Sequence, residues 1–159
     1  MGKIYNKNDL ISAVMRWRAD NKIIVFTNGC FDIIHRGHVE YLAKAKSMGD
    51  VLILGLNSDN SVKKLKGPGR PYVTQSDRAY ILSQLIPIDA VCIFEEETPL
   101  NLIKFVKPDV LVKGGDYTPD AIVGKKEVEQ NGGTVVAIPL VKGRSTTGLI
   151  EKIKNLKPE

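Results

Sequence analysis

Short apolar runs alternate with longer amphipathic segments along almost the whole of this chain. Five runs have the length and composition of strands: residues 23–27, 51–56, 90–94, 110–112 and 134–138. Segments with helical spacing or helix-start signals lie around them, at residues 7–19, 37–47, 74–84, 98–106, 125–130 and 146–155. Repeated strand–helix units of this length predict parallel strands with right-handed crossovers and helices on both faces. We therefore expect an α/β fold, a Rossmann-like doubly wound sheet of about five parallel strands.

The chain length fits one domain with a core of its own. A chain of 159 residues is large enough to bury a sizeable core. The helix predicted over residues 7–19 carries Leu10, Val14 and Trp17 at helical spacing, so we expect it to pack on the edge of the domain. We expect residues 1–159 to form a single domain.

Polar residues mark the start of two predicted helices. Thr74 is the expected N-cap of one, with Asp77 three residues on. Thr98-Pro99 predicts an N-cap followed by proline at the first position of the other. Residues 64–73, rich in Lys, Gly and Pro, are expected to form a loop before Thr74.

Composition narrows the classes of partner. The net charge of +5 suits a small polyanion, such as a nucleotide or a sugar phosphate, as well as a nucleic acid. The lysines are spread along the chain and only 6% of residues are aromatic, which argues against nucleic acid. Cys30 and Cys92 form no C-x-x-C motif, so we expect reduced thiols. Without a spanning apolar stretch or a signal peptide, the sequence predicts no membrane partner and a cytoplasmic location.

The segments with unusual composition follow the ends of predicted strands. They comprise residues 27–38, 57–59, 113–116 and 142–147. In open α/β sheets, ligands bind outside the carboxyl ends of the strands, at the point where the strand order reverses. We therefore expect these segments to converge on one site.

Both histidines of the chain lie in one element, His35-Arg36-Gly37-His38. It stands between a buried strand with a Gly-containing turn and the start of a predicted helix, where free backbone amides and the helix dipole favour an anion. Two imidazoles there can donate to phosphate oxygens, and the glycine lets a bulky group approach the backbone. This context favours a phosphate site. Two alternatives remain open: a metal site that also uses Cys30 and Asp32, which no further Cys or His supports, and a helix cap with incidental histidines.

Arg144-Ser145-Thr146-Thr147-Gly148 follows the last predicted strand and opens the last predicted helix. A single hydroxyl there would be an ordinary helix cap. Three hydroxyls beside an arginine and a glycine can also supply donors and charge to a triphosphate. Together with the histidine element, they favour a nucleotide site.

Lys113-Gly114-Gly115-Asp116 follows the fourth predicted strand. Its glycines permit positive φ and a close backbone approach, and Asp116 can accept hydrogen bonds from a sugar or a base. A plain tight turn is an equal alternative for the glycines.

A basic loop and a helical lysine can each be interpreted either as part of a phosphate site or as ordinary surface. Lys66-Gly67-Pro68-Gly69-Arg70 is a basic loop, either a lid over phosphates or an ordinary solvated loop. Lys44, in the helix after the histidine element, either reaches back to the phosphates or is a surface lysine.

These residues resemble the HxGH nucleotidyltransferase superfamily, whose cytidylyltransferase-like members carry G-x-F-D-x-x-H-x-G-H and a late S-T-T. The corresponding residues are Gly29-Cys30-Phe31-Asp32-Ile33-Ile34-His35-Arg36-Gly37-His38 and Ser145-Thr146-Thr147. Within the superfamily, the chain is most similar to the adenylyltransferases of D-glycero-β-D-manno-heptose 1-phosphate. That likeness runs from the N-terminal helix to the end of the chain and rests on Thr27–Asp32, Leu65-Lys66-Gly67, Gly69-Arg70-Pro71, Thr98-Pro99-Leu100 and Leu111–Tyr117.

The resemblance implies adenylyl transfer from ATP, bound with Mg²⁺, to a sugar 1-phosphate, for the synthesis of lipopolysaccharide or other surface-glycan precursors. The catalytic residues would be His35, His38 and Lys44. The nucleotide and its phosphates would contact Thr27, Asn28, Gly29, Cys30, Phe31, Gly37, Ser145, Thr146 and Thr147. Further substrate or nucleotide contacts would come from Asp32, Lys113, Gly114, Asp116 and Arg144. No metal bound by protein ligands is expected.

The resemblance also implies a homodimer, and a separate sugar kinase, because in many bacteria such a domain is fused to a kinase that we do not expect in this chain. Cytidylyltransferases of the glycerol-phosphate type have R-Y-V-D and R-T-E-G-I stretches. Here the matching segments are Ile86-Pro87-Ile88-Asp89 and Leu140-Val141-Lys142-Gly143-Arg144, which argues against cytidylyl transfer. Two alternatives stay open: a cytidylyltransferase acting on glycerol 3-phosphate or a phosphoalcohol, and a nucleotide-sensing domain without turnover.

Overall fold

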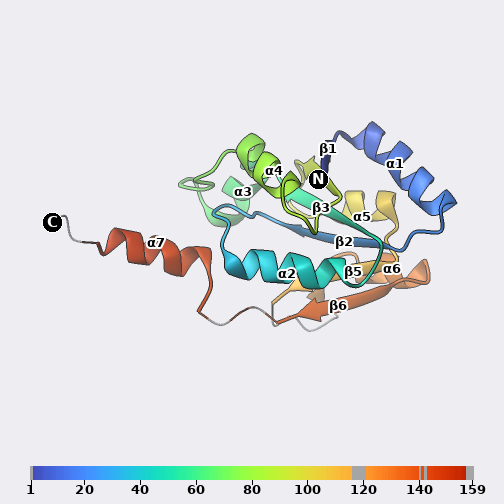
Figure 1. Ribbon diagram of the computed structural model, residues 1–159. Helices are drawn as coiled ribbons and strands as arrows, with labels where there is room; N and C mark the ends of the chain where they lie inside the picture. Colours follow the sequence, from blue (N-terminus) through green and yellow to red (C-terminus); the bar gives the residue numbers. More distant parts are fainter. Residues whose placement is uncertain (1, 116–120, 140, 142, 157–159) are drawn as a thin grey trace.

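The computed structural model describes residues 2–115, 121–139, 141 and 143–156. In this part of the chain the strands form one parallel sheet of six (Figure 1). In spatial order they are β1 (Lys3–Tyr5), β4 (Ala90–Phe94), β3 (Val51–Asn57), β2 (Ile24–Gly29), β5 (Val110–Gly114) and β6 (Thr134–Ile138). The predicted α/β fold with a doubly wound parallel sheet is confirmed, with six strands in place of about five.

β1 is the strand that the sequence analysis did not predict. It has three residues and pairs with β4 at the edge of the sheet, with Lys3 opposite Ala90. Its one aliphatic residue, Ile4, is itself 44% exposed. The segment therefore has neither the length nor the apolar content from which a strand is recognised.

Helices cover both faces of the sheet. They are α1 (Lys7–Ala19), α2 (Arg36–Lys46), α3 (Asp59–Lys66), α4 (Gln75–Ser83), α5 (Leu100–Val106), α6 (Lys125–Gln130) and α7 (Thr146–Lys154). One core cluster lies under α2 and α4, and the other under α1, α5 and α6. α7 extends away from the sheet in Figure 1 and buries no residue. Within the described ranges, every helix is too short or too polar to cross a membrane.

Two helices differ from the sequence prediction. α3 occupies part of the expected 64–73 loop: the Ser58 side chain caps it by accepting from the Ser61 amide (3.1 Å), and it runs to Lys66. Its polar sequence buries only two side chains, so it shows little helical periodicity. α5 begins one residue later than expected, with Pro99 and not Thr98 at the N-cap, because the first helical hydrogen bond runs from Ile103 N to the Pro99 carbonyl (2.9 Å). The Thr74 cap of α4 is confirmed.

The strand order reverses between β2 and β5. From β2 the chain moves outward to β3 and β4, and then returns to place β5 on the other side of β2. Residues of β2 alternate between the two core clusters, with Ile24 and Phe26 in one and Val25 in the other. The carboxyl ends of β2 and β5 therefore border the crevice where such a sheet binds its ligands.

Candidate active site

A cleft of about 630 Å³ opens at the carboxyl ends of β2 and β5. All four segments that the sequence predicted to converge contribute to its lining. The predicted site residues that line it are Asn28, Gly29, Cys30, Phe31, Asp32, His35, Gly37, His38, Lys113, Gly114, Arg144, Ser145, Thr146 and Thr147. The structure thus brings together residues from β2, β5 and the starts of α2 and α7.

Three predicted site residues do not line the described cleft. Thr27 is fully buried, and its Oγ1 lies 2.5 Å from Tyr41 Oη, whose hydroxyl also donates to the Val112 carbonyl (3.2 Å). Lys44 is exposed on α2, and the structure does not bring it to the cleft. Asp116 lies outside the described residues.

The two histidines form a stacked pair at the start of α2. Their ring centroids lie 3.9 Å apart with 18° between the planes. His35 is the N-cap residue of α2, and His38 also packs against Phe31, at 5.1 Å between centroids. Both Nδ1 atoms are buried and lack a hydrogen-bond partner in the described part of the chain. Both residues line the cleft, and buried polar atoms without a partner are rare enough to mark a candidate functional site.

Burial keeps this pair uncharged. It lowers the pKa of His38 to about 4, with a smaller contribution from the neighbouring His35. The pKa of His35 is also lowered, by burial first and by the charge of Arg144 second. Both rings are therefore neutral at neutral pH.

The start of α7 lies directly against the histidine element. Ser145 caps α7 by accepting from the Gly148 amide (3.0 Å), and Thr146 Oγ1 donates to the Ile33 carbonyl (3.3 Å). A Cβ placed on Gly37 would lie 3.1 Å from Arg144 Cβ. The absence of a side chain at Gly37 therefore permits the close approach of α2 to the Arg144–Thr147 segment.

A lysine and an asparagine meet across the switch point of the sheet. Lys113 Nζ, at the end of β5, donates to Asn28 Oδ1, at the end of β2 (3.3 Å). Burial lowers the pKa of Lys113. Burial also raises the pKa of the Cys30 thiol, although several nearby cations act to lower it. Burial therefore favours the uncharged form of both side chains in the cleft lining.

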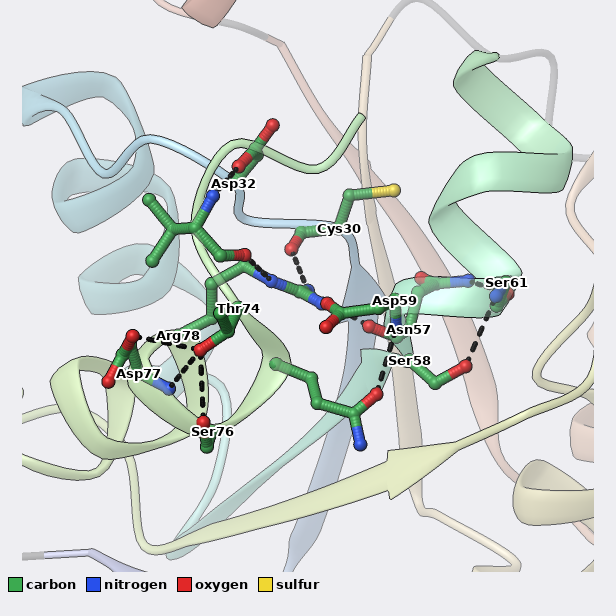
Figure 2. A network of polar contacts seen from close by, with 12 residues as sticks. Cys30, Asp32, Asn57, Ser58, Asp59, Ser61, Thr74, Ser76, Asp77 and Arg78 are labelled. Atoms are coloured by element: carbon green, nitrogen blue, oxygen red, sulfur yellow. Dashed lines mark hydrogen bonds and ion pairs between the residues drawn. The ribbon is translucent and has the colours of Figure 1, made fainter. Parts of the chain in front are cut away.

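Arg78 is a structural residue of the site that the sequence analysis missed (Figure 2). It is fully buried; Nη1 donates to the carbonyls of Cys30 (2.6 Å) and Asn57 (2.9 Å). Nη2 donates to Asp59 Oδ1 (2.8 Å), and Nε donates to the Val73 carbonyl (3.0 Å). One guanidinium thus joins the carboxyl ends of β2 and β3, the start of α3 and the loop before α4. Nothing in the local sequence of α4 distinguishes this arginine from a surface one.

Asp32 holds a loop within the protein. Oδ2 accepts from Arg70 Nε (2.6 Å), and Oδ1 accepts from the amides of Tyr72 (2.8 Å) and Val73 (2.9 Å). Burial acts to raise the pKa of Asp32, but these hydrogen bonds outweigh it and the pKa is lowered. Its carboxylate therefore secures the loop before α4, and Arg70 joins the cleft lining as a residue outside the predicted set.

The described residues offer no cluster of three or more His, Cys, Asp or Glu side chains with the geometry of a metal site. The carboxylates in the described lining are Asp32, whose oxygens are engaged, and Glu97. This lining fits a cation carried by the phosphates of a ligand, and not one enclosed by the protein.

The sequence of this chain is similar to those of known proteins. Residues 26–151 match the cytidylyltransferase-like family. The bifunctional protein HldE of Geobacter metallireducens is 58% identical over 151 residues, which cover 95% of this chain and 31% of that protein. HldE of Trichlorobacter lovleyi is 54% identical over the same length and coverage. The chain thus spans about a third of the length of these relatives.

Two solved structures share the fold. The lipopolysaccharide core biosynthesis protein of Thermoplasma volcanium is 27% identical, with a TM-score of 0.63 over 77% of this chain and 99% of that one. Pantothenate synthetase of Thermus thermophilus is 18% identical, with a TM-score of 0.60 over 89% of this chain and 62% of that one. The second likeness concerns the fold alone.

Proposed function

The chain belongs to the cytidylyltransferase-like family, and from that premise we propose that it transfers an adenylyl group from ATP to D-glycero-β-D-manno-heptose 1-phosphate. The products are ADP-heptose and pyrophosphate. The observation that carries the proposal is the stacked His35–His38 pair facing the hydroxyl-bearing start of α7 in one cleft. The HldE relatives and the lipopolysaccharide core biosynthesis protein support the choice of a heptose acceptor.

The reaction needs positioning and charge neutralisation more than covalent help from the protein. A phosphate oxygen of the sugar attacks the α-phosphorus of ATP, and the bond from that phosphorus to the β-phosphate bridging oxygen breaks. His35 and His38 would donate to the phosphoryl oxygens on which charge develops. The Ser145–Thr147 segment and the α7 amides would bind the β- and γ-phosphates.

A divalent cation, Mg²⁺, would enter with ATP on its phosphate oxygens. When bound, it neutralises charge on the triphosphate and on the leaving pyrophosphate. The engaged oxygens of Asp32 favour this role over a protein-enclosed metal. A homodimer and a cytoplasmic location are further parts of the proposal, and light scattering of the purified chain tests the first.

The test is pyrophosphate release with Mg²⁺ and heptose 1-phosphate, comparing ATP with CTP. We expect release with ATP, and a loss of about a hundredfold or more in kcat for His38→Ala. Release with CTP alone, and with glycerol 3-phosphate as acceptor, would replace the heptose assignment by the cytidylyltransferase alternative. ATP binding without any pyrophosphate release would instead favour a nucleotide-sensing domain.

A further inference from the structure

We propose that Arg70 binds the phosphate of the acceptor substrate, and that Asp32 is the positioning residue that presets its guanidinium. This inference rests on the proposed function, because it divides one cleft between a nucleotide and a second phosphate-bearing substrate. It assigns a ligand role to the loop before α4, which the sequence left open between a lid and an ordinary solvated loop.

The guanidinium of Arg70 is hydrogen-bonded through Nε, whereas its two Nη atoms have no partner among the described residues. Nε donates to Asp32 Oδ2 (2.6 Å), and Cζ lies 5.1 Å from the centroid of the Tyr72 ring. The hydrogen bond and the ring together fix the plane of the group. In the described part of the chain, Nη1 and Nη2 make no hydrogen bond or ion pair, and Arg70 lines the cleft. Two parallel N–H groups in a fixed plane match the oxygens of a phosphate.

The anchor of this arginine is buried and fully engaged. The side chain of Asp32 is 1% exposed, against 20% for that of Arg70. Asp32 also accepts from the Tyr72 and Val73 amides, and the Val73 carbonyl accepts from buried Arg78. The loop is therefore held from both sides before any ligand arrives. A preset donor binds more tightly than a mobile one, because less side-chain entropy is lost on binding.

The position of Arg70 in the fold favours the acceptor over ATP. The loop that carries it joins α3 to α4, on the β3–β4 side of the switch point. α7, which would bind the triphosphate, follows β6 on the other side. The histidine pair lies at the start of α2, after the central strand β2. An acceptor phosphate held by Arg70 would therefore enter from the β3–β4 side of the histidine pair, whereas the chain reaches α7 from β6, an arrangement that in-line displacement can use.

The test compares Arg70→Ala, Arg70→Lys and Asp32→Asn with wild type in the pyrophosphate-release assay. We expect Arg70→Ala to raise KM for heptose 1-phosphate by about 10- to 100-fold, the usual effect of a lost charged hydrogen bond, with a change in KM for ATP below about threefold. Arg70→Lys keeps the charge and loses the fork, so it should recover only part of the loss. Asp32→Asn should raise the same KM, and the double variant Asp32→Asn/Arg70→Ala should be no worse than Arg70→Ala.

Exposed Arg16 on α1 supplies the matched control, since Arg16→Ala removes an arginine far from the cleft lining. Its two KM values should equal those of wild type. Equal rises in both KM values for Arg70→Ala, or no rise in either, would overturn the inference. So would additive effects of the two substitutions, since they would deny that Asp32 acts through Arg70.

A second measurement separates this inference from the proposed function. If wild type releases no pyrophosphate with the heptose phosphate, the proposed function fails, and binding calorimetry then tests Arg70 directly. With α,β-methylene ATP present, inorganic phosphate should bind at least about tenfold more weakly to Arg70→Ala than to wild type, while affinity for the nucleotide analogue stays the same. Equal phosphate affinities, or no phosphate binding to wild type, would overturn the assignment of Arg70.

Discussion

The imidazole rings of His35 and His38 stack 3.9 Å apart, and the described structure provides no hydrogen-bond partner for either Nδ1. Two charged rings at this distance would repel each other, and burial disfavours even one charge. The ligand-free pair is therefore held neutral at neutral pH, at a helix start that favours an anion. A bound phosphate would reverse this balance by supplying negative charge to both rings.

The pair should make the stability of the ligand-free protein depend on pH. Between about 4 and 6.5, an unfolded histidine binds a proton that folded His38, with its pKa lowered to about 4, does not bind. The free energy of unfolding therefore rises with pH through this window, by at most about 1.4 kcal/mol per pH unit for one proton. Urea unfolding at pH 5 and pH 7 measures the change. The double variant His35→Asn/His38→Asn should lose this part of the dependence, and an unchanged dependence would contradict the prediction.

The two histidines should take up protons when a nucleotide triphosphate binds. An anion beside the rings raises their pKa values from the lowered ones of the free protein, so at pH 5.5 protons move from buffer to protein. Calorimetric titration with α,β-methylene ATP, in buffers of different ionisation enthalpy, counts these protons. The terminal phosphate of the ligand also titrates near this pH, so the difference between two proteins reports on the histidines. We expect wild type to take up more protons than His35→Asn/His38→Asn. Equal numbers for the two proteins would contradict a phosphate at this pair.

The parts of the fold that were predicted correctly are those with a strong local signal. Every residue of β3 is buried, as in a strand covered on both faces, and its apolar run is unmistakable. The histidine element was placed correctly because strand, turn and helix start follow one another within it. β1 and α3 were missed because β1 is defined by its pairing with β4, and because α3 is mostly polar.

The internal partners of the site could not be predicted, because they depend on contacts far apart in the chain. Arg78 reaches the Cys30 carbonyl, 48 positions away, and Arg70 reaches Asp32, 38 positions away. Asp32 was expected to contact substrate or nucleotide, which fits its place in the motif. Its oxygens are taken by the loop before α4, a fact that only the packing of that loop reveals.

Gly37→Ala should separate activity from stability. The backbone of Gly37 is helical, so alanine is conformationally acceptable and can add up to about 1 kcal/mol to the free energy of unfolding. Its Cβ, however, would lie 3.1 Å from atoms of His35 and from Arg144 Cβ, tighter than ordinary contact. We expect kcat for pyrophosphate release to fall at least about tenfold, since small misplacements of reacting groups are costly.

The matched control for Gly37→Ala is Ala43→Gly, at an exposed position of the same helix. It should lower the free energy of unfolding by about 1 kcal/mol and leave kcat unchanged. Thermal or urea unfolding gives the stability of both variants, and steady-state assays give kcat. Full activity of Gly37→Ala would show that the approach of Arg144 to α2 is not needed for turnover.

Loss of the Arg78 guanidinium should be among the most destabilising single substitutions in this chain. Arg78→Met fills a similar volume but leaves the Asp59 carboxylate and the Cys30 and Asn57 carbonyls without this donor. Removing one partner of a buried charged network typically costs about 3–5 kcal/mol. Because Asp59 is 31% exposed and can be hydrated, we expect a loss near the lower end of that range.

Arg78→Lys keeps the charge but cannot reach four acceptors at once, so it should lower the free energy of unfolding by less than Arg78→Met does. Urea unfolding measures both, with Arg16→Ala, expected within about 0.5 kcal/mol of wild type, as the exposed control. A loss below 1 kcal/mol for Arg78→Met would mean that the carboxyl ends of β2 and β3 are held together without this arginine.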